Sequence, residues 1–71
     1  MFQACMHGED YIISTQSFDG FDEYMNRVAK NLSSRVGQER LYRPLYDFGL
    51  NCARDEAKRD SVEIPSQYMI K

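Results

Sequence analysis

The chain has 71 residues, a net charge of −2 and a mean hydropathy of −0.63. A chain this short makes a single domain, residues 1–71, whose core alone supplies only about 3–5 kcal/mol. No apolar run approaches bilayer length, which excludes a membrane-spanning protein, and an apolar content of 42% with clear patterning excludes disorder.

The N-terminal part of the chain predicts a β-hairpin. Residues 2–6 and 11–16 are short apolar or β-branched runs, and the four residues between them include Gly8. Two such runs joined by a glycine-containing link are typical of antiparallel strands. Because a two-stranded ribbon is unstable alone, we expect it to pack on a helix.

Residues 19–36 predict an amphipathic helix. Apolar side chains recur there with the 3.6-residue period of one helix face. Asp19 is a suitable N-cap, with Asp22 as an acidic version of the capping-box partner. Gly37 is placed to end the helix.

A second helical segment is predicted at residues 38–60. It carries two apolar stripes, which indicate a helix contacted on more than one side. Pro44 is unfavourable in a helix interior, so we expect a turn at 38–43 and a helix that restarts with Pro44 near its first position. Gly49 in mid-helix indicates close packing or a kink.

Residues 61–71 return to extended character, and Pro65 restricts such a segment to a sheet edge or an irregular stretch. The predicted fold is therefore α+β. It consists of an N-terminal hairpin packed on two helices, with a C-terminal extended segment on the sheet edge.

No catalytic or metal motif is visible, so we expect no enzymatic activity, no metal and no other cofactor. Cys5 and His7 would share a strand face as a nucleophilic pair, but no third orienting group is readable. With Cys52 and with Glu9 or Asp10 they offer metal ligands, but they lack the paired spacing of structural zinc sites. No signal peptide is visible, so we expect a cytoplasmic location in which both cysteines are free thiols.

Uneven charge along the chain is the main functional signal. The first 26 residues hold five carboxylates and no lysine or arginine, whereas residues 27–43 carry five basic groups against one acid. Tyr42 and Tyr46 are candidate aromatic anchors, because tyrosine is enriched at interfaces. The candidate acidic binding face comprises Glu9, Asp10, Asp19, Asp22 and Glu23.

These patterns predict a non-catalytic module that binds another protein and acts by steric occlusion of the partner's surface. Phages and plasmids often encode inhibitors and adaptors of this size and charge. We also expect self-association into a dimer, because so small a core gains stability from a partner. The alternative is a small nucleic-acid-binding regulator, although a pI of about 5.2 weighs against it. Its candidate residues are Arg27, Lys30, Arg35, Arg40 and Arg43.

Overall fold

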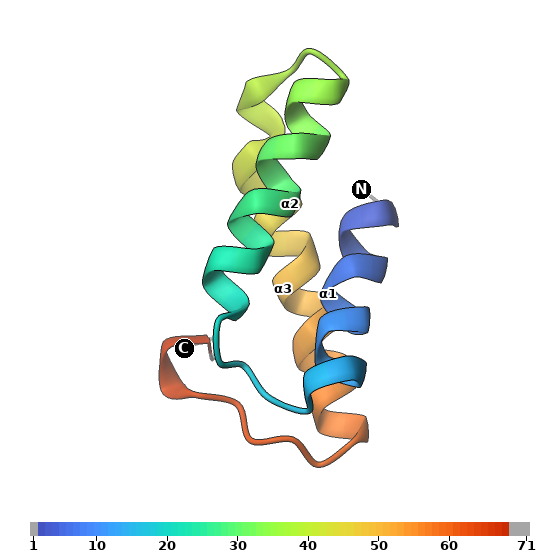
Figure 1. Ribbon diagram of the computed structural model, residues 1–71, viewed down its shortest axis with the longest axis vertical. Helices are drawn as coiled ribbons and strands as arrows, with labels where there is room; N and C mark the ends of the chain where they lie inside the picture. The colour runs from blue at the N-terminus through green and yellow to red at the C-terminus, as the bar shows by residue number, and fades with distance from the viewer. Residues whose placement is uncertain (1, 69–71) are drawn as a thin grey trace.

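The computed structural model describes residues 2–68, which form an antiparallel bundle of three α-helices. In Figure 1 α1 descends, α2 ascends beside it and α3 descends again, while the tail crosses beneath the bundle toward the start of α2. The elements in chain order are α1 (Phe2–Thr15), α2 (Phe21–Arg35), the 3₁₀ turn η1 (Glu39–Leu41), α3 (Tyr42–Arg59) and the 3₁₀ turn η2 (Ser66–Tyr68).

The predicted α+β fold is wrong, because both hairpin strands and their link are one helix, α1. Its buried face consists of Ala4, Gly8 and Ile12, which recur every four residues along one side of a helix. Gly8 lies in this contact face and makes no turn. The described residues contain no strand, so the tail cannot lie on a sheet edge. Residues 69–71 of the predicted extended segment lie outside the described part of the chain.

The helix predicted at 19–36 is confirmed as α2, but its cap is different. The N-cap is Gly20, with a φ of 75°, and no side chain caps this end of the helix. The prediction of Asp19 as the N-cap, with Asp22 as its capping-box partner, is therefore wrong. Asp22 instead accepts a hydrogen bond from the hydroxyl of Tyr46. Gly37 has a φ of 68° just past the end of α2, as its placement predicted.

The second predicted helical segment is confirmed with its interruption. The chain turns through η1, and α3 then begins at Tyr42, so that Pro44 lies in the first turn of the helix. There its missing N–H costs no intrahelical hydrogen bond. Helix α3 packs against both α1 and α2, as its two apolar stripes indicated.

Helices α1 and α3 cross at two glycines. A Cβ atom added to Gly8 would lie 2.2 Å from the carbonyl oxygen of Gly49, so the two backbones are in direct contact. This confirms the close packing predicted at Gly49. Not even an alanine side chain fits at Gly8 without moving the backbone, and the contact fixes how far α1 can shift along α3.

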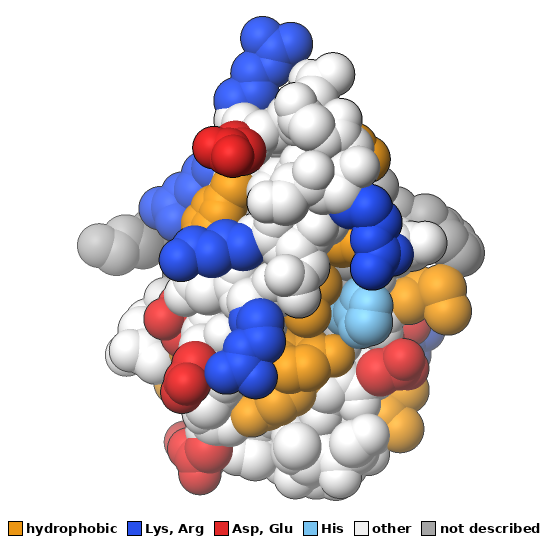
Figure 2. Space-filling view, turned by 45° about the horizontal axis from the view of Figure 1, so that its top comes forward, with side chains coloured by type: hydrophobic (Ala, Val, Ile, Leu, Met, Phe, Trp, Pro, Cys, Tyr) orange, Lys and Arg blue, Asp and Glu red, His pale blue; other side chains and the backbone are white. Residues whose placement is uncertain are grey.

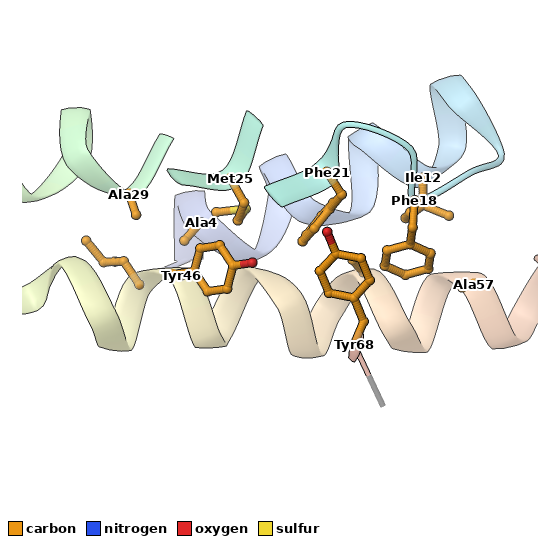
Figure 3. Close-up of a cluster of buried hydrophobic side chains, with 11 residues drawn as sticks. Ala4, Ile12, Phe18, Phe21, Met25, Ala29, Tyr46, Ala57 and Tyr68 are labelled. Carbon is orange, nitrogen blue, oxygen red and sulfur yellow. The ribbon is translucent and has the colours of Figure 1, made fainter. Parts of the chain in front are cut away.

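An aromatic cluster closes the lower end of the bundle and holds the tail. The ring of Tyr68 stacks on Phe18 at 5.2 Å and meets the edge of Phe21 at 5.6 Å. Arg54 Nη1 on α3 donates a hydrogen bond to the carbonyl oxygen of Tyr68 at 3.0 Å. Figure 3 shows these rings beside the aliphatic part of the core. The described helices include none that is long and apolar enough to cross a membrane.

Candidate functional site

The five acidic candidates lie on α1, on the connection to α2 and on the first turn of α2. Three of them have partners within the molecule. Glu9 Oε1 lies 3.3 Å from Cys5 Sγ, and a Glu23 oxygen lies 3.8 Å from Arg27 Nη2. Asp22 accepts hydrogen bonds from Tyr46 and Asn26. Asp10 and Asp19 are exposed on the surface. Whether these residues bind a partner stays a prediction.

The two candidate tyrosine anchors have different environments. Tyr46 is only 8% exposed, and its hydroxyl donates a 2.6 Å hydrogen bond to Asp22 Oδ1. Burial and then the hydrogen bond to Asp22 raise the pKa of Tyr46 well above its ordinary value. Tyr46 thus belongs to the core of the fold. Tyr42 is half-buried and lines a shallow hollow of about 360 Å³ between α2 and η1.

The hydrogen bond between Tyr46 and Asp22 has a measurable effect on stability. We expect Tyr46→Phe to lower the free energy of unfolding at pH 7 by about 1 kcal/mol, which is typical of a lost hydrogen bond. Because the folded pKa of Tyr46 is raised, this contribution is complete below pH 10 and declines above it, where the unfolded chain ionises first. Urea unfolding at pH 7 and pH 10.5 measures both effects.

The matched control for this experiment is Tyr42→Phe, four residues away, which we expect to change stability by less than about 0.5 kcal/mol. The wild type should lose more stability between the two pH values than Tyr46→Phe does. Burial also raises the pKa of Tyr24 and Tyr68, so the variant will still lose some stability. If the free energy of unfolding changed with pH by the same amount in wild type and Tyr46→Phe, the contribution of the hydrogen bond between Tyr46 and Asp22 would be contradicted.

The basic residues lie along α2 from its second turn onward, in the turn η1 and at the start of α3. We call this group the basic tip; it comprises Arg27, Lys30, Arg35, Arg40 and Arg43, all of them exposed. The turn between α2 and α3 folds this stretch of sequence back on itself. The end of the bundle that this turn forms extends well beyond the start of α1 (Figure 1). In Figure 2, most lysine and arginine side chains lie over the upper part of the face and some reach the lower part, where most acidic ones lie.

Two features of the basic tip, its few ion pairs and its position at the start of α3, add no stability to the folded protein. Within residues 2–68, only Arg27 of the group forms an ion pair. Arg40 and Arg43 lie where α3 begins, and the first turn of that helix holds no acidic residue. The positive end of a helix dipole disfavours cations by about 0.3–1 kcal/mol each. The dipole of α3 therefore disfavours Arg40 and Arg43, whereas that of α2 favours Arg35 in its last turn.

A second hollow, of about 570 Å³, was not predictable from the sequence. It forms where the returning tail approaches α2 and α3, so its lining comes from three distant parts of the chain. It is open to solvent and mixed in polarity. Its lining residues are Asp22, Arg43, Tyr46, Asp47, Leu50, Gln67 and Tyr68.

The cysteines are not free thiols as predicted. Cys5 and Cys52 form a disulfide between α1 and α3, with their Cα atoms 5.3 Å apart. The crossing of the two helices, which the predicted hairpin did not contain, brings them together. His7 lies on another side of α1, with Nδ1 3.2 Å from the hydroxyl of Tyr24, so no cysteine–histidine pair forms. Both sulfurs and a carboxylate oxygen of Glu9 lie within 4.8 Å of one another.

Comparisons with known proteins give no family for this chain. No protein-family model matches it, and neither a curated protein nor a solved structure is detectably similar to it.

Proposed function

We propose that the protein is a non-catalytic binding module that docks its basic tip onto an acidic surface of a partner protein and occludes that surface. The observation that carries this proposal is that Arg43 in the first turn of α3 and Arg40 in the preceding turn η1 lie near the positive end of the α3 dipole and form no ion pairs among the described residues. Because neither arginine is paired with a carboxylate of the described residues, both can bind carboxylates on the surface of a partner protein.

The shape and composition of the tip support a protein partner. Val36 is 61% exposed at the end of α2, between two arginines of the tip. Arginine beside exposed apolar surface is typical of protein interfaces, where it supplies much of the binding energy. The acidic remainder of the molecule would orient the protein during encounter by repelling the same surface.

Nucleic acid is the second candidate partner, and the unpaired cations of the tip favour it. Phosphate contacts through Lys30, Arg35, Arg40 and Arg43 would make binding fall steeply with salt. One acidic residue, Glu39, lies among the residues of the basic tip in sequence, and it lines the neighbouring hollow together with Tyr42. The overall acidic charge of the chain limits this candidate to contacts made by the tip alone.

Self-association and a cytoplasmic location remain predictions. A dimer would cover Met6 and Ile13, which are 48% and 52% exposed and seven residues apart along α1. A monomer mass at micromolar concentration in light scattering would contradict the dimer. The disulfide counts against a cytoplasmic location, because disulfides persist chiefly in oxidising compartments.

The docking proposal is tested by affinity capture from a lysate of the source organism, with and without nuclease. We expect Arg40→Gln/Arg43→Gln to reduce recovery of the partner about tenfold, as the loss of roughly 1.4 kcal/mol of binding energy would. The matched control, Lys58→Gln/Arg59→Gln, removes the same charge from the opposite end of α3 and should leave recovery unchanged.

The outcomes of this capture experiment are distinct. A protein that is recovered equally with and without nuclease, and that depends on the tip, would support the primary proposal. Loss of the recovered material on nuclease treatment would support nucleic acid as the partner instead of a protein. Equal losses in the two charge variants would contradict a role for the tip.

A further inference from the structure

We propose that Cys5, Glu9 and Cys52 form a redox-controlled site for a thiophilic divalent cation of the zinc class. In the dithiol form of the protein, two thiolates and one carboxylate would bind the ion, and the fourth tetrahedral position would stay open to water or to an external ligand. In the disulfide form the site cannot bind a metal, because both sulfurs are covalently occupied.

The helices hold the three ligand residues in a fixed frame. Cys5 and Glu9 are four residues apart on α1 and lie on the same side of that helix. Cys52 faces them from α3, three residues after Gly49, and Gly8 follows Cys5 by the same interval. The glycine crossing, beside the bond between the sulfurs, therefore holds the two helices at a short separation.

The distances match those of a tetrahedral site. With metal–sulfur bonds of about 2.3 Å and metal–oxygen bonds of about 2.0–2.2 Å, neighbouring ligand atoms lie roughly 3.5–3.8 Å apart. Cys5 Sγ and Glu9 Oε1 are already 3.3 Å apart, and all three ligand atoms fall within 4.8 Å of one another. After reduction the two sulfurs must separate and the Glu9 carboxylate must shift slightly, which side-chain rotation on helices with a 5.3 Å Cα–Cα distance allows.

The short distance between Glu9 and Cys5 allows a favourable interaction in the dithiol form and in the metal-bound form, but not in the disulfide form. In the disulfide form no proton lies between the Cys5 sulfur and the Glu9 carboxylate, so their 3.3 Å approach is not a hydrogen bond. In the dithiol form the Cys5 thiol can donate a hydrogen bond to the half-buried carboxylate. In the metal-bound form both atoms coordinate the ion.

The switch between the two forms is a thiol–disulfide exchange with a dithiol reductant. One thiolate of the reductant attacks one protein sulfur, which releases the other protein sulfur as a thiolate and forms a mixed disulfide. The second thiolate of the reductant then attacks the reductant sulfur of that mixed disulfide and releases the first protein sulfur. The reductant leaves as its own disulfide, and the protein gains two electrons and two protons. Metal binding then displaces the protons of both thiols, and Glu9 binds as a carboxylate.

The experiment uses cobalt(II) as a spectroscopic probe and zinc(II) as its competitor. The reduced full chain should bind one equivalent of Co²⁺ with a thiolate-to-cobalt charge-transfer absorption, and Zn²⁺ should abolish that absorption. The oxidised chain should show neither. Glu9→Gln should weaken Zn²⁺ binding about tenfold or more, because it removes a charged ligand, whereas the neighbouring control Asp10→Asn should bind as the wild type does.

Circular dichroism of the reduced, metal-free protein accompanies the titration. If reduction unfolds the helices, the site predicts that Zn²⁺ restores them in wild type and in Asp10→Asn, at about tenfold lower concentration than in Glu9→Gln. Absence of the charge-transfer absorption in the reduced chain overturns the proposal. Equal affinity of wild type and Glu9→Gln overturns it as well, because the site would then be two thiols without the carboxylate.

Discussion

Replacing Gly8 with alanine should strongly destabilise the protein. The added Cβ would lie 2.2 Å from the carbonyl oxygen and 2.9 Å from the carbonyl carbon of Gly49, and neither is a side-chain atom that could rotate away. Helices α1 and α3 would have to separate. Overpacking typically costs about 1–3 kcal/mol and more when backbone must move, so we expect a loss of about 3 kcal/mol or more from the free energy of unfolding.

The sign of this effect is informative, because alanine favours an isolated helix over glycine by about 1 kcal/mol. Urea unfolding followed by circular dichroism measures the change. The matched control is Ser14→Ala, an exposed position on the same helix, where alanine should be neutral or slightly stabilising. Equal stability of Gly8→Ala and Ser14→Ala would show that α1 does not cross α3 at Gly49.

Reduction of the Cys5–Cys52 disulfide should cost about 4 kcal/mol. The two cysteines are 47 residues apart, and closing a loop of that length removes about this much free energy from the unfolded chain in the chain-entropy description. Because the core alone supplies about 3–5 kcal/mol, the reduced, metal-free protein keeps only that contribution, so reduction should remove about half of the free energy of unfolding.

Urea unfolding with and without a dithiol reductant, in the presence of a metal chelator, tests this expectation. The double variant Cys5→Ser/Cys52→Ser serves as the matched control. It should have the midpoint of the reduced wild type and should not respond to the reductant. A wild-type midpoint that the reductant leaves unchanged would contradict a disulfide between α1 and α3.

The sequence allowed α2 and α3 to be predicted because both have long apolar stripes with helical period. In α1 the buried stripe consists of Ala4, Gly8 and Ile12, two of which are small and add little to a hydropathy pattern. The larger side chains around them fall into two short runs, and periodicity cannot distinguish a short buried strand from a helix. A glycine between two such runs favours a turn, although Gly8 lies inside α1.

The prediction of free cysteines was wrong because contacts between residues far apart in the sequence decide it. Whether Cys5 and Cys52 can bond depends on the position of α1 against α3, which only the packed bundle defines. The basic tip could be predicted as a group because its residues are close in sequence. The inward position of Tyr46 could not, since the hydrogen bond from its hydroxyl to Asp22 joins residues 24 apart.

The central functional claim is that the basic tip is the binding face. The most direct test is nuclear magnetic resonance of the isotopically labelled protein, titrated with the partner recovered by capture. The account predicts that amide shifts concentrate in the second half of α2, in η1 and in the first turn of α3. Shifts centred on Asp10 and Asp19, with the residues of the basic tip unchanged, would contradict it.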